Sequence, residues 1–325
     1  MTEPDAAARR MRVVFMGTGE IGVPAFRWLL AAPECEVVAA VSQPDKPAGR
    51  KLELRASAIK QLAVERGVPV LQPVRMRAPD AVAEIVALQA DVIVVMAYGQ
   101  ILPKAVLEAA RLACLNLHAS LLPRWRGAAP IQAAIEAGDQ ASGVTVMYMA
   151  EGLDTGDILL LRATPIGRRE TGGSLHDRLG VIAAEALAEA WPLLAAGCAP
   201  RFPQDETQTN YAPKLARENG AIDWAATPRE IDRRIRAMNP WPAAHTFLPT
   251  PDGPRQLKVF SCIQHRRESG PAGGVLRADR RGLLVGAGTG AVLLREVQME
   301  GKKRMPAGEF LRGHPVAVGT LLGAR

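Results

Sequence analysis

The chain carries an asparagine, a histidine and an aspartate in a pattern that suits acyl-transfer chemistry. Asn116 and His118 lie two residues apart in the segment CLNLHASLLPRWRGAAPIQ, and Asp154 lies in the polar segment MAEGLDTGD. An amide side chain can donate a hydrogen bond to a developing oxyanion, an imidazole can move a proton, and a carboxylate can orient that imidazole. Together the three side chains suit a reaction that passes through a charged tetrahedral intermediate.

A strand and a loop are needed to position this trio. Residues 112–118 predict a β-strand, and because side chains alternate along a strand, Cys114, Asn116 and His118 share one face. Asn116 and His118 stand at its carboxyl end, where open α/β sheets place their ligands. Asp154 falls in a loop bounded by glycines. Cys114, deeper on the same face, is interpreted as a small core residue.

The first two thirds of the chain alternates between strand and helix patterns. Predicted strands cover 13–16, 36–41, 68–71, 91–96, 112–118, 142–150 and 157–162, and predicted helices cover 24–31, 57–66, 79–88, 131–137 and 174–196. Apolar runs such as DVIVVM are typical of strands buried on both faces of a parallel sheet. The pattern predicts a doubly wound, Rossmann-like α/β domain over residues 1–197.

A glycine motif after the first strand raises the question of a dinucleotide. Gly17, Gly19 and Gly22 spell G-x-G-x-x-G. A dinucleotide site also needs an acidic residue at the end of the second strand to hold the ribose, and Ser42 and Gln43 stand there instead. The glycines are therefore interpreted as a tight turn that packs a helix on the sheet, and no NAD is expected.

The last third has a different organisation. Residues 198–216 are rich in Pro, Gln and Thr and predict a linker. A predicted helix over 228–237 and short strands over 256–263, 274–278, 283–286 and 291–299 follow. The pattern favours a small β-barrel (OB-like) domain over residues 217–325.

The excess positive charge of the chain is confined to that last third. Residues 217–325 carry 18 Lys and Arg against 10 Asp and Glu, whereas residues 1–216 carry 22 against 23. A bias in one part alone indicates a polyanionic partner for that part.

Composition excludes several other classes of protein. The four cysteines lie far apart without a C-x-x-C pair, and the five histidines are scattered, so neither a disulfide framework nor a metal site is expected. No apolar run is long enough to span a membrane, and the polar N-terminus predicts no signal peptide. A cytoplasmic protein is expected.

Longer motifs carry a resemblance to a known family. The segment NLHASLLPRWRGAAPI, followed by EGLDTGD, resembles the folate-dependent formyltransferases. The segments QPDKPAGR, AYGQILP, NYAPKL, NPWPAAHT and EGKKRM are similar to those of the branch that acts on methionyl-tRNA. The similarity runs from Met11 to about Arg312, so it covers nearly the whole chain.

The resemblance implies a reaction and roles for the trio. A formyl group would pass from 10-formyltetrahydrofolate to the amino group of methionine on initiator tRNA. Asn116 would donate to the oxyanion, His118 would be a second donor and the proton source for N10, and Asp154 would orient His118. The resemblance also implies a folate site made by Ser120, Leu121, Leu122, Pro123, Tyr98, Gly99, Gln100 and Leu102.

The resemblance further implies two surfaces that grip tRNA. Arg50 and Lys51 lie in a loop that would wedge into the acceptor end, although the following KLELRASAIK departs from the family pattern. Lys302, Lys303 and Arg304 form the densest basic cluster of the C-terminal domain. A monomer that binds initiator methionyl-tRNA and folate, without metal and away from membranes, is the expectation.

Three alternatives stay open from the residues alone. The trio equally suits a formyl-folate enzyme that acts on a small amine, although such a substrate needs no basic domain. The glycine motif by itself suits an NAD(P) oxidoreductase, because the basic loop after the second strand could receive a 2′-phosphate. A plain RNA-binding module would explain the charge and leave the trio unexplained.

Overall fold

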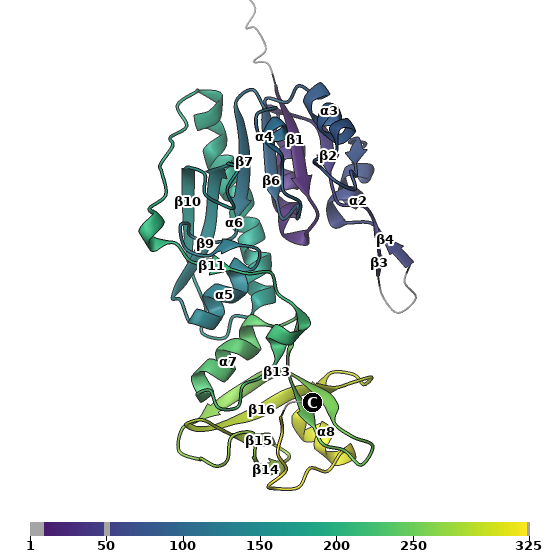
Figure 1. Ribbon diagram of the computed structural model, residues 1–325, viewed down its shortest axis with the longest axis vertical. Helices are drawn as coiled ribbons and strands as arrows, with labels where there is room; N and C mark the ends of the chain where they lie inside the picture. The colour runs from purple at the N-terminus through teal and green to yellow at the C-terminus, as the bar shows by residue number, and fades with distance from the viewer. Residues whose placement is uncertain (1–9, 49–52, 324–325) are drawn as a thin grey trace, which may run out of the picture. The chain divides into compact units, whose positions relative to one another are not determined.

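The N-terminal part of the chain is built on a seven-stranded sheet, in a computed structural model that describes residues 10–48 and 53–323 (Figure 1). The strand order is β10 (Ile158–Pro165), β9 (Ala141–Tyr148), β7 (Ala113–His118), β6 (Val92–Met96), β1 (Met11–Gly17), β2 (Cys35–Val41) and β5 (Val70–Leu71). The five strands from β7 to β5 are parallel, and β9 runs antiparallel to β7. The predicted doubly wound domain with a mainly parallel sheet is confirmed.

Helices cover both faces of this sheet. They are α1 (Val23–Ala31), α2 (Ala58–Glu65), α3 (Pro79–Ala87), α4 (Lys104–Leu107) and α6 (Gly172–Ala195). Alternation along β1 sends Val14 and Met16 into a core shared with Ile85 of α3. The intervening Phe15 faces the other way, and its ring stacks on Phe26 of α1 at 4.9 Å between centroids.

The glycine motif forms the tight turn from β1 through the 3-10 helix η1 (Glu20–Gly22) into α1. A Cβ on Gly17 would lie 2.7 Å from the Phe15 ring and 3.0 Å from the carbonyl oxygen of Met96. The amides of Thr18 and Gly19, which a pyrophosphate site would direct at its ligand, donate instead to the carbonyl of Ala97. These contacts support a packing role for the glycines.

Contacts divide the chain into two compact units. The first comprises the described residues of Met1–Gly127, Ser142–Thr164 and His176–Tyr211, and the second comprises those of Ala128–Ala141, Pro165–Leu175 and Ala212–Arg325. Two further short strands, β3 (Lys46–Ala48) and β4 (Glu53–Arg55), form an antiparallel hairpin in the first unit.

The second unit is built on an antiparallel sheet. Its order is β12 (Ala244–Leu248), β13 (Arg255–His265), β16 (Gly290–Met299), β15 (Gly282–Ala287) and β14 (Val275–Asp279), with β17 (Met305–Pro306) beside β16. The C-terminal segment bridges the two edges. Leu322 donates its N–H to the carbonyl of Gly273 at 2.8 Å, and Gly323 accepts the N–H of Phe247 at 3.0 Å. Both edges of the sheet are therefore hydrogen-bonded to the same closing segment, as in a sheet that curls into a barrel.

Three helices complete the second unit: α5 (Pro130–Ala137), α7 (Pro228–Ala237) and α8 (Ala307–Gly313). Thr227 caps α7 in a reciprocal arrangement with Glu230, which explains why the helix begins where the pattern predicts. Arg234 of α7 pairs with Glu136 of α5. The remaining short elements are β8 (Arg126–Gly127), β11 (Tyr211–Ala212), η2 (Glu206–Gln208) and η3 (Arg217–Gly220).

Several short elements were not predicted from sequence. They include β3, β4, β8, β11, β12, β17, α4 and α8. Strand β12 has only five residues, and it pairs both with the next strand, β13, and with the distant Gly323, so its stability is partly tertiary. Within the described residues, no helix is both long and apolar enough to cross a membrane.

Candidate active site

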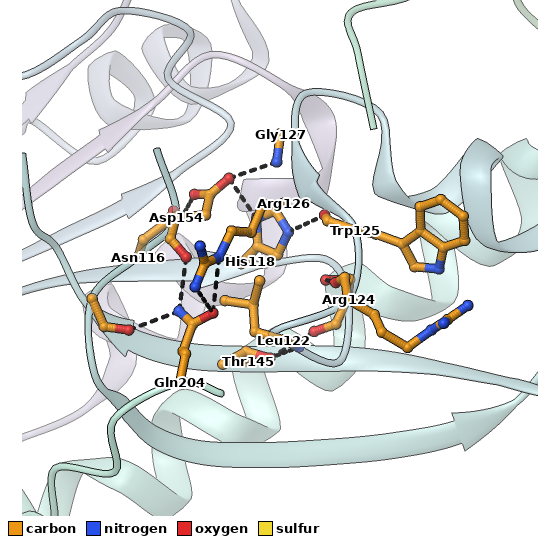
Figure 2. Close-up of polar contacts among 12 residues, drawn as sticks. Asn116, His118, Leu122, Arg124, Trp125, Arg126, Gly127, Thr145, Asp154 and Gln204 are labelled. Carbon is orange, nitrogen blue, oxygen red and sulfur yellow. Dashed lines mark hydrogen bonds and ion pairs between the residues drawn. The ribbon is translucent and has the colours of Figure 1, made fainter. Parts of the chain in front are cut away.

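The trio predicted from sequence comes together at the carboxyl end of β7 (Figure 2). Asn116 Nδ2 donates to Asp154 Oδ1 at 3.3 Å, and His118 Nδ1 lies 3.6 Å from Asp154 Oδ2. The backbone N–H of Gly127 also donates to Oδ2, at 2.8 Å. Two donors, from β7 and from Gly127, and the His118 ring therefore surround one carboxylate, and residues separated by 38 positions form one polar cluster.

The ring of His118 is held on both sides. Its Nε2 lies 2.9 Å from the carbonyl oxygen of Trp125, and because a carbonyl can only accept, Nε2 carries the proton in this contact. A second proton, taken up at Nδ1, would face Asp154. His118 is 6% exposed, so the ring is oriented by these two contacts with little competition from water.

Asp154 lies in a strained loop between β9 and β10. Its φ of 53° lies in the left-handed region, which a residue other than glycine rarely adopts. Such strain persists only where surrounding contacts over-determine it, and it gathers at functional sites. Gly156 allows the loop to close, because a Cβ at that position would overlap the carbonyl oxygen of Tyr148.

A second layer of polar side chains, which the sequence did not reveal, backs this loop. Gln204 Nε2 donates to the carbonyls of Asp154 at 2.7 Å and Gly156 at 2.8 Å. Arg126 donates to Gln204 Oε1 and to both carboxylate oxygens of Glu206. The first half of the predicted linker, residues 198–216, thus supplies two side chains that contact the site. Arg126 lies in the segment RWRGAAP, and nothing in the spacing of that segment singles it out.

The Ser120–Pro123 turn is anchored on β9. Thr145 Oγ1 donates to the carbonyl of Ser120 at 2.7 Å and accepts the N–H of Leu122 at 3.1 Å. Ser120 Oγ donates to the carbonyl of Arg124, and both Ser120 and Leu122 are buried, whereas Leu121 and Pro123 are half-buried. These contacts fix the turn that follows His118.

The loop after β6 presents unpaired peptide groups. The Tyr98 side chain is buried, and its carbonyl accepts from Thr18 Oγ1 and Gln43 Nε2. In the described structure, the backbone groups of residues 99–102 make no hydrogen bond. Gln100 uses its side chain to hold Pro73 and Met76. Leu102 is buried in the core. The loop therefore offers donors and acceptors at the sheet edge where ligands bind.

Two cavities lie near the sheet but away from the trio. One of about 330 Å³ is lined by Arg75, Met76, Arg77, Gln100 and Ile101. The other, of about 350 Å³, is lined by residues of α1, α2 and α6 and by the segment before α1. Neither includes Asn116, His118 or Asp154, so the arrangement of donors, rather than a cavity, identifies the site.

The predicted basic residues differ in their surroundings. Arg50 and Lys51 lie outside the described residues. Lys302 and Lys303 are exposed, and no described residue pairs with their side chains. Arg304 donates to Glu296 Oε2 at 2.6 Å, and its guanidinium lies 4.1 Å from the Phe260 ring centre. Arg304 is thus also part of the packing of its unit.

Cys114, next to the trio on β7, gives a first prediction. Burial raises the pKa of its thiol to about 12, and the thiolate is the reactive form of cysteine. Iodoacetamide at pH 8 is expected to modify the exposed Cys198 and to leave Cys114 unmodified, as read by peptide mass spectrometry. Protein unfolded in urea, in which all four thiols react, is the control. Rapid modification of Cys114 in the folded protein would contradict its assignment to the core.

Among the described residues, no three His, Cys, Asp or Glu side chains gather closely enough to hold a metal ion. The chemistry available at the cluster is that of its amide, imidazole, carboxylate and backbone N–H groups.

Comparison with known families identifies the chain. Residues 11–191 match the family described as Formyl transferase, and residues 214–315 match the Formyl transferase, C-terminal domain. The chain belongs to the formyl transferase family. The matched N-terminal region contains the whole Asn116, His118 and Asp154 cluster, so the cluster lies in the part of this formyl transferase that is shared with its relatives.

Curated relatives of this formyl transferase match it over nearly their full length. A methionyl-tRNA formyltransferase of Geotalea uraniireducens is 47% identical over 97% of this chain and 99% of its own. A methionyl-tRNA formyltransferase of Pseudomonas paraeruginosa is 48% identical over 96% of this chain and 100% of its own.

Solved structures share the fold at low identity. An N-formyltransferase from Helicobacter canadensis, in complex with folinic acid and dTDP-3-aminofucose, has a TM-score of 0.65 and 16% identity, over 87% of this chain and 99% of that one. HypX from Aquifex aeolicus, in complex with tetrahydrofolic acid, has a TM-score of 0.61 and 20% identity. That match covers 97% of this formyl transferase and 51% of HypX.

Proposed function

We propose that this formyl transferase moves the formyl group of 10-formyltetrahydrofolate to the free amino group of methionyl initiator tRNA. The observation that carries the proposal is the convergence of Asn116, His118 and the Gly127 N–H on Asp154, within a chain about 47% identical to methionyl-tRNA formyltransferases. The product would be formylmethionyl-tRNA, the substrate of translation initiation.

The reaction asks little of the enzyme for activation of the nucleophile. An α-amine has a pKa of about 8, and esterification of the neighbouring carboxyl lowers it, so much of the amine is unprotonated at neutral pH. The harder steps are stabilisation of the oxyanion and departure of N10 with a proton. The site residues are assigned to these two steps.

Asn116 and His118 supply the donors that the transition state needs. The amide of Asn116 has two N–H groups, of which one is used on Asp154. The other can donate to the oxyanion. A protonated Nδ1 of His118 can provide a second donor and deliver its proton to the leaving nitrogen. Asp154 keeps that nitrogen oriented and balances the positive charge of the ring.

The bond changes balance without a covalent enzyme intermediate. The amine nitrogen bonds to the formyl carbon and loses one proton, while the bond from that carbon to N10 breaks and N10 gains one proton. The buried thiol of Cys114 is not needed as a nucleophile.

Folate would bind along the loop of residues 98–102 and the Ser120–Pro123 turn. The peptide groups of residues 99–102, which make no hydrogen bond to any described residue, suit the polar edge of a pterin, which carries both donors and acceptors. Folate supplies the activated one-carbon group; the chain's own groups hold it against the end of β7.

Transfer RNA would be held by the basic residues of the C-terminal part and by the loop with Arg50 and Lys51. Residues 217–325 carry the excess positive charge of the chain. Because phosphate contacts release counterions, the affinity is expected to fall steeply with salt.

The assay that tests this function offers the purified chain 10-formyltetrahydrofolate and methionyl initiator tRNA. Formylmethionyl-tRNA is the expected product, with no formylation of free methionine, sugar amines or glycinamide ribonucleotide. Transfer to a small amine alone would replace this function by that of a small-amine formyltransferase.

The basic cluster gives a prediction that separates tRNA binding from folding. A variant with Lys302→Ala and Lys303→Ala is expected to lower the slope of log Kd against log salt by about 1–2, because each phosphate contact contributes about 0.9. Its melting temperature should be unchanged. Arg304→Ala should also lower the stability by about 1 kcal/mol, because it loses its partners Glu296 and Phe260.

The control for that comparison is Arg66→Ala, which removes one exposed cation from the first unit. A tRNA affinity that Lys302→Ala and Lys303→Ala leave unchanged at every salt concentration would remove these lysines from the tRNA surface.

A further inference from the structure

We propose that Gln204 is a positioning residue that holds Asp154 in its catalytic arrangement. This inference rests on the proposed function and adds to it a residue from outside the trio. Gln204 lies in the segment that follows α6, and its amide spans the gap between Arg126 and the Asp154 loop (Figure 2).

The amide of Gln204 can adopt only one orientation. Arg126 has no acceptor, so its Nε and Nη2 donate to Gln204 Oε1 at 3.0 and 2.9 Å. The Nε2 group then faces the loop and donates one proton to the carbonyl of Asp154 and the other to that of Gly156. All four hydrogen-bonding positions of the amide are used, so Gln204 fixes two backbone carbonyls at once.

The Asp154 loop needs such a support. Asp154 has a φ of 53°, which an unsupported aspartate would leave for a commoner conformation. The carboxylate is held by Asn116 and Gly127, but these contacts act on the side chain and not on the loop backbone. Gln204 supplies the backbone contacts, and a shift of the loop would carry the carboxylate away from His118.

Arg126 is anchored in turn. It is 9% exposed, and both oxygens of Glu206 accept from its guanidinium, which lowers the pKa of Glu206. A few residues further on, Asn210 accepts the N–H of Trp125, whose carbonyl holds His118. Gln204 thus supports the backbone of Asp154, and Asn210 supports the backbone partner of His118.

The first test is a matched pair of glutamine variants. Gln204→Leu keeps the size of the side chain and removes every hydrogen bond. It is expected to lower kcat for formyl transfer by about 10–100-fold, the usual effect of losing a residue that orients a functional ligand. The KM for methionyl-tRNA should change less than twofold. Gln208→Leu, which removes a contact between two exposed residues only, should leave kcat unchanged.

A double-mutant cycle separates positioning from general stability. If Gln204 acts through Asp154, Gln204→Leu should lower the residual kcat by less than about threefold in an Asp154→Ala background. If Gln204→Leu lowered kcat by the same factor in the wild-type and Asp154→Ala backgrounds, Gln204 would act elsewhere and the proposal would be overturned. A kcat of wild-type size in Gln204→Leu alone would do so as well.

A third readout needs no activity. The N–H of Gly127 is bonded to Asp154 Oδ2 at 2.8 Å, so its hydrogen exchange reports the placement of the carboxylate. Gln204→Leu is expected to speed exchange at Gly127 by tenfold or more relative to Gln208→Leu, below the melting temperature of both. Equal exchange rates would overturn the proposal. Wild-type protein that does not formylate methionyl-tRNA would overturn the proposed function. The hydrogen exchange at Gly127 would even then show whether Gln204 positions Asp154.

Discussion

His118→Ala and Asn116→Ala are each expected to lower the rate of formyl transfer by about 10²–10³, the usual cost of losing an oxyanion donor or a positioned acid. Neither side chain lies in the basic surface assigned to tRNA, so methionyl-tRNA affinity should change less than twofold. Single-turnover formylation and filter binding of the same protein measure the two quantities separately.

A second histidine provides the control. His176 is the first residue of α6 that belongs to the first unit, and its side chain is partly exposed. Among the described residues, its ring nitrogens contact only Asp177. His176→Ala should therefore turn over at the wild-type rate. If His118→Ala or Asn116→Ala also retained wild-type turnover, the assignment of the trio as catalytic would be wrong.

Gly156→Ala is expected to lower formyl transfer by about 10²-fold, the upper end of the effect of losing a positioning contact, and to destabilise the first unit by about 1–3 kcal/mol. A Cβ at this position would overlap the backbone carbonyl of Tyr148, so β9 and the Asp154 loop must separate. That movement would break the bond from Tyr148 N–H to the Asp157 carbonyl and the bond from Gln204 to Gly156. Thermal unfolding and kcat measure the two effects.

Gly152 offers a matched control in the same loop. A Cβ there would meet only the side chain of Thr155, whose hydroxyl and methyl groups come closest and can rotate away. Gly152→Ala should thus cost much less in stability and activity. Equal behaviour of the two variants would mean that the close approach at Gly156 does not constrain the loop.

The fold was largely predictable because its signals are local. Long apolar runs such as β6 and well-capped helices such as α7 follow from hydrophobic period and capping residues. Strand β12 and the closing segment of residues 319–323 were not predictable, because each is short and part of its hydrogen bonding comes from far along the chain, as between Phe247 and Gly323. A short segment gains much of its structure from what it pairs with.

In the candidate site, too, the sequence predicted the trio but not the residues that support it. Residue types and alternation placed Asn116 and His118 on one face of one strand end, and a polar loop bounded by glycines supplied Asp154. The resemblance to formyltransferases added the role of each side chain. The composition of residues 198–216 indicated only a linker. In the structure Gln204, Glu206 and Asn210 from that segment support the site.

The amino-acid sequence by itself therefore determined the α/β class, the trio, the family resemblance and the separation of charge, because each depends on residue type and spacing along the chain. The three-dimensional arrangement was needed to show which groups meet: the donors around Asp154, the support from Gln204, and the use of the Thr18 and Gly19 amides on Ala97. Hydrogen bonds depend on distance and direction between atoms, and segments far apart in sequence acquire these only when the chain folds.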